Sequence, residues 1–151
     1  MITKGSVWDV SKRILLVTDF YNQDQVLEYR DAIKSLDLNI NDCELLFFTN
    51  KENNGMTKEL ASVNYLSRKD LGFFGKIKNE AFLKLMKRRF DLMIVIGEID
   101  KRFLKKIERF KFEFGVGVNS QISFININLK MNSKDPLELV NFTKKTLQKI
   151  Q

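Results

Sequence analysis

The stretch DLMIVIG, residues 91–97, has five consecutive apolar residues closed by a glycine. A run that is apolar at every position, rather than at alternate positions, is typical of a strand with both faces buried in a parallel sheet. RILLVT at 13–18 has the same character, and CELLFFT at 43–49 is predicted as another strand. Because both faces of such a sheet must be covered, these runs predict helices above and below it.

The segments between the apolar runs have the spacing of amphipathic helices. After the first run, one helical stripe carries Val26, Leu27, Tyr29, Ile33 and Leu36, and Asn22 is placed to cap that helix. Further helices are predicted at 80–90, 101–110 and 137–150, the last with Asp135 as N-cap and Pro136 in its first turn. Shorter strands are predicted at 62–66, 112–118 and 122–129.

Strands that alternate with helices in this way imply βαβ units. We therefore predict one three-layer α/β domain over residues 1–151, Rossmann-like or flavodoxin-like, with a mostly parallel sheet and helices on both faces. A chain of 151 residues is long enough to enclose one sizeable core.

The chain has a single cysteine, Cys43, and no histidine. One cysteine excludes a disulfide within the chain and argues against a cysteine-based metal site. Without histidine, zinc hydrolysis and Ser-His or Cys-His nucleophilic catalysis of the usual kind are excluded. We therefore predict no metal and recognise no catalytic set. Cys43 is expected to be an inert core thiol, and Trp8 a lid on the core.

No apolar stretch approaches the length that spans a bilayer, and residues 1–13 lack the apolar segment of a secretory signal. We therefore expect a cytoplasmic protein without a membrane span. The turns after the strong strands contain no glycine-rich dinucleotide fingerprint, so no cofactor is predicted.

The net charge of +7 is concentrated in the middle third of the chain. Residues 58–111 carry 15 basic and 7 acidic side chains, a net +8, whereas residues 1–57 carry 6 and 9, a net −3. A field of one sign favours an anionic partner such as RNA, a nucleotide or an acidic lipid. The alternative is that the lysines only solvate the outer faces of two helices. The candidate nucleic-acid-binding residues are Arg68, Lys69, Lys76, Lys78, Lys84, Lys87, Arg88, Arg89, Lys101, Arg102, Lys105 and Lys106.

The segment RKDLGFFGKIKN, residues 68–79, places two phenylalanines between basic residues. Its GFFGK is not a P-loop, which requires four residues between its glycines and a serine or threonine after the lysine. It has the letters of the GXXG loop of KH domains, but two phenylalanines do not suit a loop that phosphates must approach. We expect Phe73 or Phe74 to anchor this segment in the core, with the glycines permitting tight turns.

A second candidate site lies at the predicted carboxyl ends of the strands, where parallel sheets bind ligands if the strand order reverses. The residues of this alternative pocket are Asp19, Thr49 and Glu98, and Asp100 follows closely. Carboxylates that converge there would hold a magnesium ion or act as acid and base. The alternative is that they cap the helices that follow the strands.

The run from SRKDLGFFGKIKN through FDLMIVIG to FEFGVG resembles a family of small bacterial α/β proteins of unknown function. Members carry an Asp, an aromatic and a Gly-Lys, often then a proline, followed by an FDLLI strand and a Lys/Phe-rich strand ending in VG. The matching positions are Asp70, Phe74, Gly75 and Lys76, then 90–94 and 112–115. Ile77 stands where the proline often is, which implies a less rigid loop. This resemblance brings no assigned activity.

The chain is also faintly similar to the N-terminal half of heptosyltransferase-type glycosyltransferases, which have an FDLVI strand followed by a helix and an RIGY strand. It has only one such half and lacks the nucleotide-sugar domain. The resemblance therefore implies that the chain does not transfer sugars alone.

These observations lead to one leading hypothesis and two alternatives. The first is a non-catalytic protein whose basic residues 58–111 dock on RNA or a ribonucleoprotein. The second is a protein or enzyme that binds a nucleotide or nucleotide-sugar in a pocket at the strand ends. A scaffold subunit that pairs through an apolar face is the third.

Overall fold

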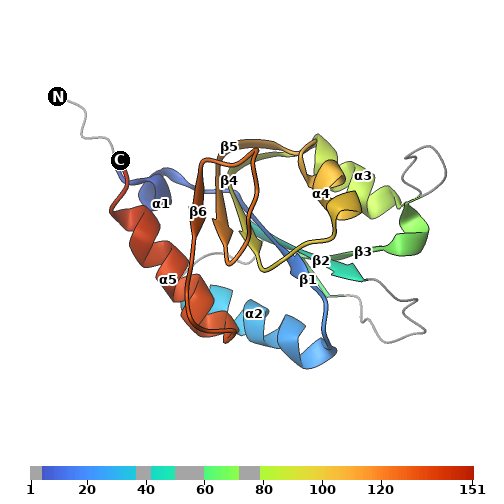
Figure 1. Cartoon of the computed structure of the whole chain (residues 1–151), viewed down its shortest axis with the longest axis horizontal. Coiled ribbons are helices and arrows are strands. Elements are labelled where there is room, and N and C mark those ends of the chain that lie inside the picture. Colours follow the sequence, from blue (N-terminus) through green and yellow to red (C-terminus); the bar gives the residue numbers. More distant parts are fainter. Residues whose placement is uncertain (1–4, 37–41, 50–59, 72–78) are drawn as a thin grey trace.

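The computed structural model describes residues 5–36, 42–49, 60–71 and 79–151 (Figure 1). Six strands form one sheet in the order β3-β2-β1-β4-β5-β6, and every neighbouring pair is parallel. The strands are β1 (Ile14–Asp19), β2 (Cys43–Thr49), β3 (Val63–Ser67), β4 (Arg89–Ile96), β5 (Lys111–Val118) and β6 (Ile127–Leu129). This arrangement confirms the predicted α/β class and extends the parallel pairing to the whole sheet.

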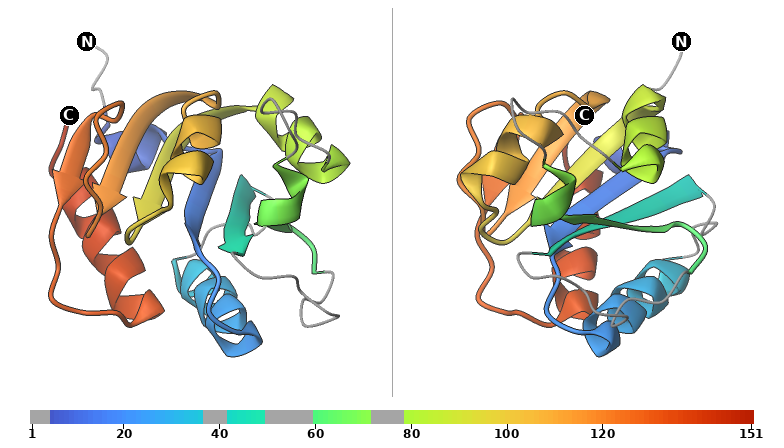
Figure 2. Two further views of the ribbon diagram at one scale, coloured as in Figure 1. Left: turned by 45° about the vertical axis from the view of Figure 1, so that its right-hand side comes forward. Right: turned by 90° about the vertical axis from the view of Figure 1, so that its right-hand side faces the viewer.

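Helices cover both faces of the sheet, as the apolar runs predicted (Figure 2). One face is covered by α1 (Val7–Val10), α2 (Gln23–Ser35) and α5 (Pro136–Gln148). The opposite face is covered by α3 (Glu80–Lys87) and α4 (Lys101–Ile107), and the short 3-10 helix η2 (Arg68–Asp70) follows β3. The helix predicted at 80–90 is shorter than expected because Arg89 and Phe90 already pair with β5.

Side-chain caps fix where the main helices begin. The Asn22 side chain accepts a hydrogen bond from the backbone N–H of Gln25, and Asp135 accepts one from Glu138. Both predicted N-caps are therefore confirmed. Pro136 occupies the first turn of α5, where its missing N–H leaves no helical hydrogen bond unmade.

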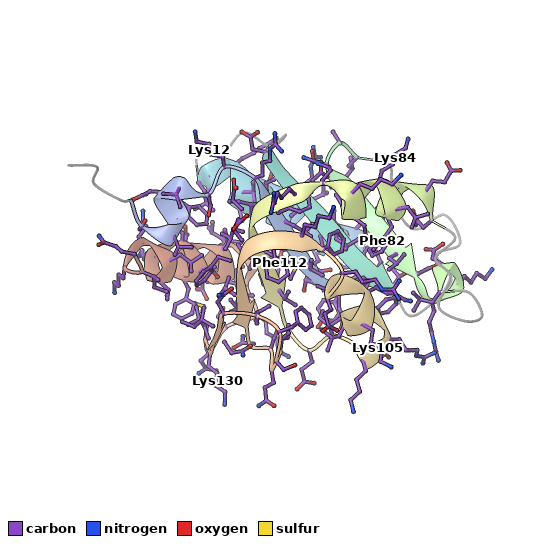
Figure 3. The ribbon with its side chains drawn as sticks, turned by 90° about the horizontal axis from the view of Figure 1, so that it is seen from above. Lys12, Phe82, Lys84, Lys105, Phe112 and Lys130 are labelled. Atoms are coloured by element: carbon purple, nitrogen blue, oxygen red, sulfur yellow. The ribbon has the colours of Figure 1, made fainter. Side chains whose placement is uncertain are left out.

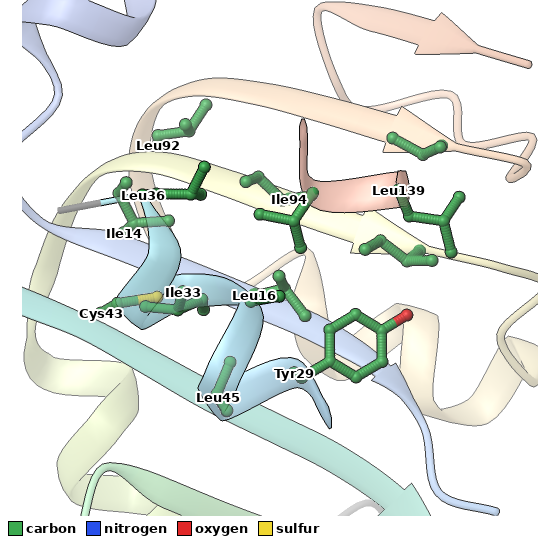
Figure 4. Close-up of a cluster of buried hydrophobic side chains, with 14 of the residues drawn as sticks. Ile14, Leu16, Tyr29, Ile33, Leu36, Cys43, Leu45, Leu92, Ile94 and Leu139 are labelled. Atoms are coloured by element: carbon green, nitrogen blue, oxygen red, sulfur yellow. The ribbon is translucent and has the colours of Figure 1, made fainter. Parts of the chain in front are cut away.

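The core on the α2 and α5 side joins alternate residues of the central strands to the two helices (Figure 4). Leu16 of β1 lies beside Ile94 of β4 in register, and both are at most 2% exposed. Tyr29 and Ile33 of α2 pack on them, as the helical stripe predicted. Leu27, which the same stripe included, is instead 43% exposed, because it lies at the solvent margin of the stripe. Trp8 is 8% exposed and covers the end of this core, as expected.

The opposite core uses the other set of alternate strand residues, including Leu15 and Val17. Phe48 of β2 stacks on Phe103 of α4 with ring centroids 4.4 Å apart. An aromatic pair of this kind contributes about 0.5–1.5 kcal/mol beyond its buried area. Because β1, β2 and β4 supply apolar residues to both cores, their sequences show no alternation.

The strand predicted at 122–129 is wrong over its first half. Only Ile127–Leu129 pairs with β5, whereas residues 122–126 pack over the sheet face that α3 and α4 leave uncovered beside β5. Ile122 is buried there, and Ile125 contacts the backbone of β5 so closely that a Cβ at Gly115 would lie 2.8 Å from its Cγ2. The apolar residues of 122–126 therefore pack on the face of the sheet, and this segment is not a strand of the sheet.

The two ends of the described chain meet at the amino-terminal edge of the sheet. The backbone N–H of Val7 donates a hydrogen bond to the carbonyl of Ile150 at 2.7 Å. Figure 1 shows the C-terminal end of the chain beside α1. Among the described residues, no helix has both the length and the apolar character needed to cross a bilayer.

Candidate functional site

The order of the strands reverses between β1 and β4. From β1 the chain moves outward to β2 and β3, whereas from β4 it moves the other way, to β5 and β6. The connections that leave the carboxyl ends of β1 and β4 therefore diverge, and open parallel sheets bind ligands in the crevice that results.

A cleft of about 1000 Å³ lies at this point, on the side of α2 and α5. It is formed by the ends of β1 and β4, the first turns of α2, the turn after β5 and the segment that leads into α5. Its polar and charged lining residues are Thr18, Asp19, Tyr21, Asn22, Asp24, Gln25, Glu28, Tyr29, Glu98, Asn119, Ser133 and Lys134. We call this the acidic cleft, because four carboxylates line it against one lysine.

Asp19, the last residue of β1, is the most unusual group in the acidic cleft. Its Oδ1 atom is buried and has no hydrogen-bond partner. Burial raises the pKa of this carboxyl to about 6, and the nearby Asp100 contributes in the same direction. Asp19 is therefore a carboxyl poised to ionise near neutral pH, a property typical of residues that bind or react with a ligand.

Hydrogen bonds hold in place the residues that line the acidic cleft beside Asp19. Thr18 donates a hydrogen bond from Oγ1 to the backbone carbonyl of Ile96 at 2.9 Å, which links the two central strands at their carboxyl ends. Burial raises the pKa of Tyr29 above its ordinary value, while a hydrogen bond with Thr18 opposes that shift. Gln25 donates from Nε2 to the backbone carbonyl of Asp19 at 2.8 Å and fixes the turn into α2.

A second cleft of about 820 Å³ lies on the α4 side of the turn after β4. It is formed by the first turns of α4, the segment after β5 and the segment after β6. Its charged lining residues are Glu98, Lys101 and Lys130. We call it the lysine cleft.

The three residues of the predicted alternative pocket do not all come together. Asp19 and Glu98 line the acidic cleft. Thr49 ends β2, on the far side of β1, where it is 3% exposed and its hydroxyl has no hydrogen-bond partner. Of the carboxylates weighed as helix caps, Asp100 caps α4 by accepting from the Arg102 N–H, whereas α2 is capped by Asn22 and not by Asp19.

Sequence reasoning missed several residues of the clefts. Asn119, Lys130 and Lys134 come from turns after β5 and β6, and only the strand order brings these turns to the crevice. The helical stripe predicts Tyr29 only as a core residue, although Tyr29 also lines the acidic cleft. Within the described residues, no group of three or more carboxylate or thiolate side chains is arranged to hold a metal ion.

Several of the predicted nucleic-acid-binding residues form ion pairs or are buried. Arg88 pairs with Glu44 at 2.6 Å and lies over the ring of Phe90. Arg89 pairs with Glu113 and Arg102 with Asp100, each at 3.6 Å. Lys106 is 7% exposed, and burial together with Arg109 and Lys105 lowers its pKa.

The other predicted basic residues lie on two elements of the same layer and on η2. The exposed ones are Arg68, Lys69, Lys84, Lys87, Lys101 and Lys105. Figure 3 shows Lys84 on α3 and Lys105 on α4, to either side of Phe82. Lys76 and Lys78, like Phe73 and Phe74, lie outside the described residues.

Residues 4–150 match the model of a protein family described as a family of unknown function, DUF6913. Because the match covers nearly the whole chain, the chain belongs to this family, and its resemblance to a family of unknown function is confirmed at that level. A comparison with curated proteins gives no match.

Proposed function

We propose that this member of the DUF6913 family is a small-molecule binding protein whose ligand occupies the crevice at the carboxyl ends of β1 and β4. The observation that carries the proposal is Asp19, which lines a cleft of about 1000 Å³ and has a buried Oδ1 atom without a hydrogen-bond partner. An unpartnered carboxylate destabilises the folded chain. Such a cost is typical of a site that a ligand completes.

The charges of the acidic cleft indicate the chemistry of the group that lies beside Asp19. Asp19, Asp24, Glu28 and Glu98 face one cation, Lys134. Asp24 already occupies the first turn of α2, the position where the helix dipole favours negative charge. A phosphate at this turn would be repelled, so hydroxyl and amine groups, which donate hydrogen bonds to carboxylates, are the favoured ligand groups.

This chemistry narrows the ligand to polar compounds rich in hydrogen-bond donors. Sugars, nucleosides, polyamines and the sugar end of a nucleotide-sugar all fit the description. Asp19, once ionised, would accept hydrogen bonds from such groups.

A thermal-shift screen with ribose, adenosine, putrescine and UDP-glucose tests the proposal. A compound that binds only the folded chain raises its Tm in proportion to occupancy. The shift should disappear in Asp19→Asn and persist in Asp31→Asn, an exposed carboxylate on α2 outside the cleft. A flat response across donor-rich compounds, or an equal shift in Asp19→Asn, would contradict the proposal.

A second candidate function is RNA binding by the exposed lysines of α3 and α4. The observation that favours it is their placement: Lys84 and Lys87 on α3 and Lys101 and Lys105 on α4 are exposed on helices of one layer. The edge-to-face contact of Phe82 with Phe110, whose ring centroids are 5.3 Å apart, links α3 to the turn that follows α4. Bulk RNA should then bind at low salt and be released as salt rises. Lys84→Glu with Lys105→Glu should abolish that binding, and an absence of binding at low salt would refute it.

A further inference from the structure

The acidic cleft and the lysine cleft meet at the turn that follows β4. Both are lined by Gly97, Glu98 and Asn119. One cleft lies toward α2 and α5 and the other toward α4, so the turn separates two halves of a larger crevice. A ligand longer than either half would cross this turn.

The two halves carry opposite charge. Asp19, Asp24 and Glu28 lie only in the acidic cleft, whereas Lys101 and Lys130 lie only in the lysine cleft. Glu98 belongs to the turn that both share. Neither Lys101 nor Lys130 has an ion-pair partner in the part of the chain that the structure describes. Two unpaired cations at the wall of a concave site favour an anionic ligand group there.

The two lysines lie on separate elements, and hydrogen bonds hold the backbone beside each of them. Asn119 donates its N–H to the carbonyl of Leu129 and accepts from the N–H of Met131 through Oδ1, each at 2.8 Å. These two bonds bracket Lys130. Lys101 is the first residue of α4, whose start is capped by Asp100. Because that carboxylate occupies the N-terminus of this seven-residue helix, the two side-chain ammonium groups, and not the helix end, would bind the anion.

The turn between the clefts has no side chain at Gly97, and hydrogen bonds fix its backbone. Gly97 has φ +82°, and a Cβ added to it would meet no atom within 4 Å. Its N–H donates to the carbonyl of Val118 at 2.8 Å, and its carbonyl accepts from the Ser120 hydroxyl. A ligand can therefore lie across Gly97 in the space that a side chain would otherwise fill.

We propose that the ligand is a phosphorylated polyol that bridges this turn, with its phosphate between Lys101 and Lys130 and its hydroxyl groups beside Asp19. The inference rests on the proposed function and adds a phosphate group to the hydroxyl-bearing ligand proposed there. A phosphate monoester carries a charge of about −1.5 to −2 at neutral pH. The two lysines offset this charge in part, because Glu98 also lines the lysine cleft. Its repulsion from Asp19 and Asp24 fixes the orientation of the ligand.

Titration calorimetry with matched probes tests the bridge. Ribose, ribose 5-phosphate, glucose, glucose 6-phosphate, glucuronate and inorganic phosphate are measured against the full chain. We expect at least one sugar phosphate to bind about tenfold or more tightly than its parent sugar and than inorganic phosphate, equivalent to about 1.4 kcal/mol. Lys101→Gln with Lys130→Gln should remove this gain, and Asp19→Asn should weaken the sugar and its phosphate alike.

Lys12→Gln is the matched control, since Lys12 is exposed just before β1 and lies on the opposite side of the molecule from Lys130 (Figure 3). Equal affinity for sugars and their phosphates overturns the bridge and leaves the proposed function standing. A gain for glucuronate alone overturns the assignment of phosphate. Binding of inorganic phosphate as tight as that of the sugar phosphates overturns the bridging geometry. No binding by any sugar or sugar phosphate overturns the bridge, and the separate thermal-shift screen then decides the proposed function.

Discussion

Asn79 donates a hydrogen bond from Nδ2 to Oδ2 of Asp70 at 3.2 Å, and so ties together the two ends of RKDLGFFGKIKN. The same Oδ2 accepts from the backbone N–H and the hydroxyl of Ser67. The same amide of Asn79 also donates to the carbonyl of Tyr65, while its Oδ1 caps α3. Asp70 and Asn79 therefore connect the start of α3 to the end of β3.

Asn79→Ala should lower the free energy of unfolding by about 1–2 kcal/mol, because it removes a helix cap and two further hydrogen bonds. Urea denaturation measures the change. Lys84→Ala, at an exposed position of the same helix, should leave the midpoint nearly unchanged. Equal stability of the two variants would show that the cap does not hold α3.

Asp19 should make stability depend on pH. Its pKa of about 6 in the folded chain exceeds the ordinary value of 3.8, so its ionised form opposes folding above pH 6 and this effect fades toward pH 4. In a fully buried carboxyl, this rise in pKa would lower the free energy of unfolding by about 3 kcal/mol. Asp19 is only half-buried, so solvent screening reduces the expected loss to about 1 kcal/mol.

Asp19→Asn should therefore gain stability relative to the wild type as pH rises from 4 to 7. Denaturant midpoints at several pH values measure the difference. Asp31→Asn provides the control, because it removes an exposed carboxylate from the same layer. A constant difference between Asp19→Asn and the wild type would exclude the raised pKa.

Gly115→Ala should destabilise the chain by about 1–3 kcal/mol through overpacking. Its new Cβ would lie 2.8 Å from Ile125 Cγ2 and 2.9 Å from Phe112 Cε2. In an Ile125→Ala background, which removes the clashing Cγ2, the added cost of Gly115→Ala should be smaller. If the single variant is as stable as the wild type, residues 122–126 do not pack against β5 as described.

Cys43 should react with a thiol reagent only when the chain unfolds. The side chain is 1% exposed, and burial, with smaller contributions from Glu44 and Asp42, raises the pKa of its thiol to about 12. At pH 8 the native thiolate is therefore scarce and enclosed. Labelling by DTNB should be slow in buffer and rise with urea in parallel with unfolding. Rapid labelling in buffer would place Cys43 in a segment that opens locally.

The central strands were predictable because burial on both faces requires apolar residues at consecutive positions. β1, β2 and β4 are buried on both faces, so a run without polar interruption identifies them. Residues 122–126 show the limit of this reasoning. Their alternating pattern is compatible both with a strand and with a segment that packs over β5. The close contact of Ile125 with Gly115 distinguishes the two, and it is visible only in the folded structure.

The crevice was predictable only in part for a related reason. Asp19 and Glu98 follow strong strands, so their place at the carboxyl edge follows from the apolar runs. Whether Thr49 joins them depends on strand order, which local sequence does not specify, and β2 lies on the far side of β1 from β4. Asn119 positions Lys130 at the site by hydrogen-bonding to Leu129 and Met131, the chain neighbours of Lys130. Local sequence does not reveal these contacts, because they join residues ten or more positions apart.

The hydrogen bond between Val7 and Ile150 has a practical consequence for handling the protein. Both ends of the described chain leave the domain at the amino-terminal edge of the sheet, and the crevice lies at the carboxyl-terminal edge. A tag, a fused partner or an attachment to a surface at either end would therefore leave the mouth of the crevice open. A circular permutant that joins these ends with a short linker should keep the same strand order and the same binding site.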